Sequence, residues 1–342
     1  MTYDKLIRRI QREIHGIYSD AEAGIAEAVS EYIEAVIPQE QEQNKEEEKS
    51  KLITALKTAG ILEIAKQLYR INKRAKDTIN GGVPKAFADM MNEESFLMEQ
   101  EIGEEIGLFP VDEEDVAEWL EEYPEVFEIE ELDERKDERW NVQNIRNTLI
   151  TGVLLKIGGD KLTDFVTRRI LKRNEDSMRR NAEDTISGAG EAGREASWRN
   201  AESKGQDILK EWVATLDFKT RDAHRQLDGN RVPLDQPFMV DGEEIRFPRD
   251  PQAKAYLRCN CRCAMRKVRR GWAMGERREN IRHPDGSGGW YKPIVPGMTY
   301  QEWYEMKVQE LGEVEIQRQI KEMKREQQRK YYRKKKREKK GA

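Results

Sequence analysis

The stretch EWVATLDFKTRDAHRQLDGNRVPLDQPFMVDGEEIRFPRD, from Glu211 to Asp250, is where the sequence changes from long helical periodicity to short elements. Trp212 to Thr215 has the composition of a short strand. Thr220 to Leu227 fits one to two helical turns, for which Asp217 or Thr220 would supply the cap. The sequence therefore predicts a strand followed by a short helix, which the turn at Asp228 to Asn230 ends.

A β-hairpin is expected after this helix. Phe238 to Val240 and Glu244 to Phe247 flank the pair Asp241-Gly242, and this pair tolerates the positive φ angles of a tight hairpin turn. Together these elements predict a small α+β module between residues 212 and 270. The module has few apolar residues, so something other than its own core has to stabilise it.

The segment RCNCRCAMRKV, Arg258 to Val268, contains every cysteine of the chain: Cys259, Cys261 and Cys263. On an extended segment, side-chain alternation would point all three thiols to one face. Zinc prefers four nitrogen or sulfur ligands in a tetrahedral arrangement, and His224 is the expected fourth. The sequence therefore predicts a structural zinc site that stabilises the module.

Two other interpretations of the cysteines stay open. The spacing C-x-C-x-C differs from the usual C-x2-C knuckle, so Cys259 can be a bystander that Asp217 replaces as a ligand. Alternatively, Cys261 and Cys263 are small buried residues, and His224 forms a hydrogen bond within the core without a metal.

Long helices are expected before the module. Apolar residues recur at helical spacing from Ile7 to Val36, and Pro38 stops that helix. A second helical pattern, from Leu52 to Ile79, precedes a glycine-rich break, and a third runs from Trp140 to Lys210. Small residues between Ser187 and Ala196 either let another helix approach closely or mark a weak helix.

The expected fold class is mainly α. Long helices form the N-terminal and central regions, and a small α+β C-terminal module and a basic helical tail follow them. The predicted regions are an N-terminal helical region (residues 1–91), an acidic segment (92–139) and a central helical region (140–211). They are followed by the α+β module (212–270), a linker with a Trp-containing segment (271–310) and the tail (311–342).

Composition limits the class of protein. Of 342 residues, 37% are hydrophobic and 37% are charged, the mean hydropathy is −0.91, and the net charge is −5. So polar a chain favours helices with long solvated faces over one large core. No stretch resembles a secretory signal or the roughly eighteen apolar residues of a membrane span, so a soluble protein of a reducing cytoplasm is expected.

The net charge conceals two opposed blocks. Residues 93–134 contain nineteen Asp or Glu and no Lys or Arg, whereas residues 321–342 contain twelve Lys or Arg against three Glu. Within the acidic block, Asp112 is expected to cap a short helix that Pro124 ends. The block is either a docking surface for a basic partner or a solvated insertion.

The basic tail is expected to contact nucleic acid without sequence preference, through its charge and two tyrosines that can stack on bases. Docking onto an acidic surface of another protein is the main alternative, and a merely solubilising helix end is a third. The candidate nucleic-acid-binding residues are Arg325, Arg329, Lys330, Arg333, Lys334, Lys335, Lys336 and Arg337.

The module resembles the C-terminal signature of the tailed-bacteriophage head morphogenesis family, the minor head or minor capsid proteins that include the Mu F-like proteins. The resemblance covers about 60 residues, and GMTYQEW, Gly297 to Trp303, is similar to a segment that often follows it. Cys259 departs from the family's pattern. The matching signature residues are Trp212, Thr215, Asp217, Thr220, Arg221, His224, Asp228, Gly229 and Asn260 to Cys263.

This resemblance implies a low-copy component of the virion, made in the host cytoplasm and built into the phage head. It implies association with the portal protein, the scaffold or the major capsid protein. It also implies a part in prohead assembly, DNA packaging or ejection. We expect from the residues that the chain is not an enzyme.

An enzyme is the main alternative class. Asp217, Arg221, His224 and Asp228 are spaced four, three and four residues apart, so a continuous helix would align them, and with a metal ion such groups cleave phosphodiesters. Against this metal-dependent nuclease, capping already explains an aspartate at each end of a short helix. A DNA-binding regulator built on a zinc module is a further alternative, although the sequence lacks a recognition-helix signal.

Overall fold

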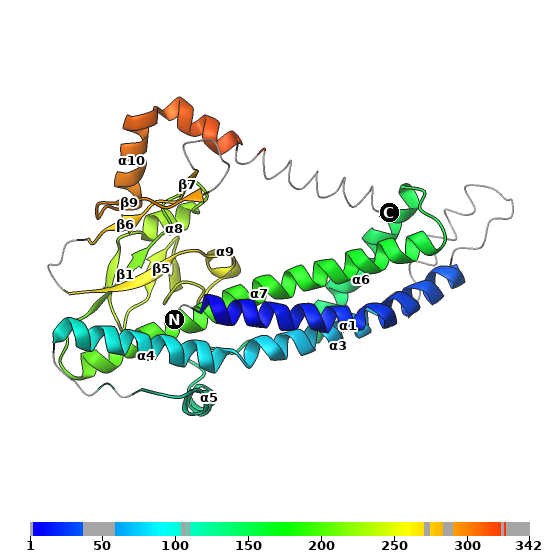
Figure 1. Ribbon diagram of the computed structural model, residues 1–342, viewed down its shortest axis with the longest axis horizontal. Helices are drawn as coiled ribbons and strands as arrows, with labels where there is room; N and C mark the ends of the chain where they lie inside the picture. Colours follow the sequence, from blue (N-terminus) through cyan, green and yellow to red (C-terminus); the bar gives the residue numbers. More distant parts are fainter. Residues whose placement is uncertain are drawn as a thin grey trace. The chain divides into compact units, whose positions relative to one another are not determined.

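The computed structural model describes residues 3–36, 59–103, 108, 110–269, 274–282, 290–322 and 325 (Figure 1). The described chain is mainly α-helical, which confirms the expected fold class. None of its helices combines the length and the apolar character that crossing a membrane requires. The helices that precede the module are α1 (Asp4–Val36), α3 (Ala59–Asn80), α4 (Val83–Ile102), α5 (Glu113–Glu122), α6 (Glu134–Leu154) and α7 (Asp160–Ser203).

Two compact units make up the chain, and each combines segments that are distant in sequence. Of the described residues, the first unit contains Val83–Ile129 and those from Asp184 onward, and the second contains Asp4–Gly82 and Glu130–Glu183. Helix α7 therefore contributes to both units.

The second unit is a bundle of α1, α3, α6 and the first part of α7, in which α3 packs against both α1 and α6. Isoleucines and leucines of the expected helical stripes are buried in it, among them Ile10, Ile14, Ile64 and Leu68. These buried positions confirm the helical periodicity of the sequence.

The first unit contains the α+β module. Its three-stranded sheet has the order β2-β1-β5, and both pairings are antiparallel. In this sheet β1 (Leu209–Val213) is central, between β2 (Arg231–Pro233) and β5 (Ala264–Val268). The strand expected at Trp212 is therefore confirmed, although it begins three residues earlier.

The expected hairpin is also present. Strand β3 (Phe238–Val240) pairs with β4 (Glu243–Ile245), and Asp241 and Gly242 between them have φ angles of 52° and 76°. Two consecutive positive φ angles are the reason why this turn uses an Asp-Gly pair.

Three glycines let other segments approach α7 closely, as the small residues between Ser187 and Ala196 predict. A Cβ added at Gly188 would lie 2.7 Å from the Arg249 carbonyl oxygen, and one at Gly190 would lie 2.8 Å from a ring carbon of Tyr3. At Gly193 it would overlap the backbone carbonyl of Phe87 on α4. No side chain fits at these contacts.

A C-terminal segment follows the sheet. It contains the paired short strands β6 (Arg277–Arg278) and β9 (Ile294–Val295), the pair β7 (Ile281–Arg282) and β8 (Trp290–Tyr291), and α10 (Tyr300–Leu311). Thr299 and Glu302 form a capping box at the start of α10, and Trp303 is buried in a cluster with Leu216. Residues 313–322 are also helical.

The acidic segment packs on the first unit through its apolar side chains. Asp112 caps α5 as expected, because its carboxylate accepts hydrogen bonds from the amides of Glu114 and Asp115. Trp119 of α5 lies edge-on against Phe87 of α4, with ring centroids 5.5 Å apart.

Candidate metal centre

His224, Cys261 and Cys263 converge in the interior of the first unit. Their candidate ligand atoms all lie within 4.8 Å of one another. His224 Nδ1 is 3.2 Å from Cys263 Sγ and 3.5 Å from Cys261 Sγ. All three side chains are buried, so a soft-metal donor set of one imidazole and two thiols is present.

The short helices α8 (Asp222–Leu227) and α9 (Ala255–Arg258) fix the imidazole. His224 Nε2 lies 2.8 Å from the Leu257 carbonyl oxygen, at the end of α9. A carbonyl can only accept, so Nε2 carries the proton and Nδ1 presents a lone pair to the two sulfurs. A backbone carbonyl that holds the far nitrogen in this way is typical of metal-ligating histidines.

Trp212 closes the cluster from the side of the sheet. Its ring lies edge-on against His224, with centroids 5.5 Å apart. Its indole N–H is buried without a hydrogen-bond partner, and it lies beside Cys263, where it favours the thiolate form. A metal-bound thiolate at Cys263 would accept this hydrogen bond and so remove the cost of burying an unpaired donor.

The two thiols titrate differently. The hydrogen bond with Cys263 lowers the pKa of the Cys261 thiol well below its usual value despite burial. The hydrogen bond with Cys261 and burial raise the pKa of Cys263 well above its usual value. Only one thiol of the pair is therefore readily ionised before a cation arrives, and a metal would be needed to ionise both.

Cys259, expected as a third sulfur ligand, is not brought to this group. It lies at the C-terminal end of α9, half-buried, and its amide donates to the Ala255 carbonyl oxygen. Asn260 follows with a φ of 53°, so the backbone turns there and the alternation begins only at Cys261. Asn tolerates this left-handed conformation better than most residues.

Asp217, the expected substitute ligand, is not brought to the group either. Its carboxylate accepts hydrogen bonds from both terminal nitrogens of Arg262, from the Asn280 amide at 3.1 Å and from the Lys219 backbone amide at 2.9 Å. Burial raises the pKa of this carboxyl, but the hydrogen bonds and charge of Arg262 outweigh it, so the pKa of Asp217 is lowered. This carboxylate is already fully engaged.

The caps expected for the helix at Thr220 to Leu227 are also wrong. Its N-cap is Arg221, which makes no side-chain cap hydrogen bond. The Thr220 hydroxyl instead donates to the Thr215 carbonyl oxygen at 2.6 Å. Thr215 and Thr220 thus fold the loop between β1 and α8 back on itself.

Asp228 anchors the C-terminal segment to the module. Its buried carboxylate pairs with both terminal nitrogens of Arg277, at 2.7 and 2.9 Å. It also accepts from the Ala214 amide at 2.6 Å and from the Tyr300 amide at the start of α10. The sequence contained no signal for the role of Arg277, because its partner lies 49 positions away.

These contacts bear on the alternative of a catalytic helix. Asp217 and Asp228 face Arg262 and Arg277 and not the cluster around His224. The four residues are aligned in sequence, but the structure does not bring them to one site. Asp217 joins two segments of the module, and Asp228 joins the module to the C-terminal segment.

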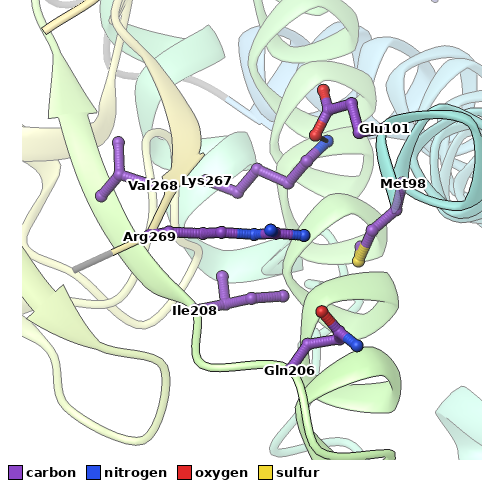
Figure 2. Close-up of a pocket in the computed structure, with 7 residues that line it drawn as sticks. All are labelled: Met98, Glu101, Gln206, Ile208, Lys267, Val268 and Arg269. Carbon is purple, nitrogen blue, oxygen red and sulfur yellow. Dashed lines mark ion pairs between the residues drawn. The ribbon is translucent and has the colours of Figure 1, made fainter. Parts of the chain in front are cut away.

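A small cavity lies in the first unit between α4 and the ends of β1 and β5 (Figure 2). Its volume is about 80 Å³, enough for two or three waters at most. Lys267 is already paired with Glu101 at 3.4 Å and with Glu94 at 3.6 Å. The cavity therefore offers no unpaired lysine to a ligand.

Of the candidate nucleic-acid-binding residues, Arg325 is helical and exposed. The others lie outside the described residues: Arg329, Lys330, Arg333, Lys334, Lys335, Lys336 and Arg337.

Residues 143–266 match the family described as Phage Mu protein F like protein. The NAD(+)–arginine ADP-ribosyltransferase EFV of Enterococcus faecalis is 30% identical over 168 residues, covering 47% of this chain and 31% of that protein. The Minor head protein GP7 of Bacillus phage SPP1 is 34% identical over 116 residues, covering 34% of this chain and 35% of that protein. The chain thus spans about a third of the length of these curated relatives. No solved structure matches it.

Proposed function

We propose, from the match of residues 143–266 with the phage Mu F-like family and the similarity to a minor head protein, that this chain is a low-copy structural component of a phage head. It acts at or near the portal, in prohead assembly, DNA packaging or ejection. The observation that supports this most is the match of residues 143–266, which includes the signature module and the helix that leads into it.

The geometry of the module fits a structural role. The signature residues mainly hold the chain together: Asp217 engages Arg262, Asp228 engages Arg277, and Asn260 supplies a left-handed turn. An active site needs groups left free for substrate. Here Asp217 and Asp228 have no free carboxylate oxygen to offer.

We further propose that the buried cluster holds a structural zinc ion through His224, Cys261 and Cys263. Bound zinc would cross-link α8 to the segment before β5, which are distant in sequence. Its fourth ligand has to come from water or from a rearrangement of Cys259. In a module with a small core, such a cross-link contributes folding free energy directly.

Co-expression with the portal, scaffold and major capsid proteins of the same phage tests the head assignment. The tagged chain is expected to retain at least one of them, and cryo-electron microscopy of purified proheads is expected to show it at the portal vertex. Asp228→Asn, which loosens the module, should reduce incorporation, whereas the exposed Asp222→Asn should not. Failure to retain any of the three proteins would refute the assignment.

The metal-dependent nuclease and the DNA-binding zinc protein make different forecasts. Phosphodiester cleavage by the purified chain that His224→Ala abolishes would support the nuclease. Binding of one DNA sequence in preference to others would support the regulator. The activity in the name of the Enterococcus faecalis relative is tested separately, by NAD+ consumption, because the match covers only 31% of that protein.

A further inference from the structure

A basic groove of about 850 Å³ lies on the first unit, at the face of the sheet that α7 does not cover. Side chains alternate along β1, so Lys210 faces Glu195 of α7, and Glu211 points to the opposite face. The groove is open on that face, and residues 276–280 border it. Its basic side chains outnumber its acidic ones, so its surface attracts anions.

Buried carboxylates hold two arginines in the groove. Glu211 accepts from Arg266 at 2.8 and 2.5 Å, and Asp217 accepts from Arg262 at 2.9 Å. The side chains of Arg262 and Arg266 stay 39% and 25% exposed, so part of each guanidinium still reaches solvent. Arginines fixed in this way lose little conformational entropy when they bind a carboxylate.

Arg278 and Lys292 add exposed cations to the same groove. Of the two carboxylates that line the groove, Glu279 is buried and pairs with Lys307 at 3.0 Å, so the exposed Glu276 is the one that opposes these cations. The groove therefore combines two oriented guanidinium groups with two exposed cations, an arrangement that fits a row of carboxylates.

Helix α5 presents such a row. Its apolar side, with Val116 and Leu120, is buried against its own unit, and its polar side is exposed. Within the described chain none of its exposed carboxylates forms an ion pair. These carboxylates belong to Glu113, Glu114, Asp115, Glu118, Glu121 and Glu122.

The two surfaces cannot meet within one chain. Figure 1 shows α5 on one side of α4, whereas β6 and β9 beside the groove lie on the other side, beyond the sheet. The apolar contact of Trp119 with Phe87 holds α5 in this position. An acidic helix for the groove therefore has to come from another molecule.

We propose that the groove binds helix α5 of a second copy of this chain. The two surfaces are different and both belong to one unit, so the contact is heterologous and links copies head to tail. Each copy uses its groove for one neighbour and its α5 for the next. The inference does not depend on the proposed role in the phage head.

Sedimentation velocity on nuclease-treated full-length protein tests the contact. The wild type is expected to associate at about 50 mM salt and to dissociate at about 500 mM, because these charges are screened. Arg278→Glu with Lys292→Glu should weaken association about tenfold or more, and so should Glu118→Lys with Glu121→Lys and Glu122→Lys. Control substitutions Glu22→Lys, Glu27→Lys and Glu31→Lys on α1 should leave it unchanged.

Mixing the two defective variants gives the decisive result. In each variant alone the groove and α5 no longer attract each other, but in the mixture the reversed groove of one variant meets the substituted α5 of the other, and the two unchanged surfaces also meet, so association should return. A wild type that stays monomeric at low salt would overturn the proposal. Association that persists when the charge of the groove is reversed would also overturn it, because α5 would then bind other cations, such as those of the tail. Association that nuclease abolishes would assign the groove to nucleic acid.

Discussion

At the scale of single residues, the positive φ angle of Asn260 separates Cys259 from Cys261 and Cys263. Strict alternation of side chains along an extended segment would place Cys259, Cys261 and Cys263 on one face, as we expected from the sequence. The left-handed Asn260 interrupts the alternation, so Cys261 and Cys263 reach His224 and Cys259 does not. Asn marks such a position only weakly, since it is also common in ordinary turns.

The first prediction concerns this cluster. Protein purified without chelators is expected to carry close to one zinc per chain, measured by elemental analysis. Cys261→Ser and His224→Ala should release the metal, because each removes a buried donor. Cys259→Ser tests the fourth position: retention of the zinc would assign that position to water, and loss would assign it to Cys259.

Hydrogen exchange then locates the effect of losing the metal. Exchange should accelerate in the module after Trp212 and not in the bundle of the second unit. A wild type without metal, or metal retained by both Cys261→Ser and His224→Ala, would leave the cluster as an ordinary buried hydrogen-bonded group.

A buried polar network in the second unit carries the second prediction. Asn72 donates to Asp137 at 2.9 and 3.1 Å and to Asn174 at 2.7 Å, and Tyr18 donates to Asn72. Asn141 donates to Asp137 at 2.9 Å. One carboxyl group thus lies among neutral partners from four helices.

Burial raises the pKa of Asp137, and the hydrogen bonds from Asn72 and Asn141 offset only part of this effect. A carboxyl with a raised pKa in the folded state stabilises the fold when protonated. Its contribution is therefore present below the usual carboxyl range and is lost as the pH rises through the raised value. Between pH 4 and pH 7, wild-type protein should lose more stability in the second unit than Asp137→Asn.

Thermal unfolding at several pH values, with hydrogen exchange to assign the unit, measures this difference. Comparing how the stability of the two proteins changes with pH removes the contribution of the other carboxyl groups, which both proteins share. Identical slopes would show that Asp137 titrates as it does in the unfolded chain.

At the scale of elements, local patterns predicted the helices and the hairpin because their signals lie within a few residues. The apolar stripe of α1, the Asp112 cap of α5 and the Asp241-Gly242 turn are examples. The pairing of Asp217 with Arg262 spans 45 positions, and that of Asp228 with Arg277 spans 49. No periodicity reports such contacts, so the sequence assigned these aspartates to caps.

The third prediction concerns the attachment of α10. Asp228→Asn leaves the buried Arg277 without its anionic partner, and breaking a buried pair from one side costs about 3–5 kcal/mol. Because Asp228 also binds the first amide of α10, the segment from residue 274 to residue 311 should loosen. Hydrogen exchange of these residues measures the effect.

The control for this substitution lies on the same short helix. Asp222 pairs with Arg225, but its side chain is 88% exposed, so Asp222→Asn should cost at most about 1 kcal/mol. Equal protection of residues 274–311 in both variants would mean that the aromatic cluster around Trp303 alone holds α10 in place.

At the scale of the whole molecule, the compact units cut across the order of the sequence. Val83–Ile129 joins the first unit, although both flanking stretches, Asp4–Gly82 and Glu130–Glu183, form the second. Composition divided the chain into consecutive regions, because charge runs and helical patterns are linear features. Which helices share a core depends on contacts between distant segments, and a single sequence does not contain them in readable form.

The last prediction concerns the basic end of the tail, Arg325 and the residues after it, of which the structure describes Arg325. Lysines and arginines on a solvated segment contact phosphate groups and not base edges, so the tail should bind DNA without sequence preference. With about five phosphates contacted, the logarithm of affinity should fall with the logarithm of salt at a slope of roughly −4 to −5. Truncation before Arg325 should abolish this slope and leave the fold intact, because the tail has few apolar residues to contribute to a core.

The same truncated chain separates this interpretation from protein docking. If the tail binds an acidic surface of portal or scaffold, truncation leaves DNA affinity unchanged and reduces incorporation into heads. If it binds DNA, affinity falls and the salt slope disappears, whether or not heads still incorporate the chain. Measuring both quantities on one protein therefore identifies the partner, and if neither changes, the tail serves only solubility, since its charge alone requires no partner.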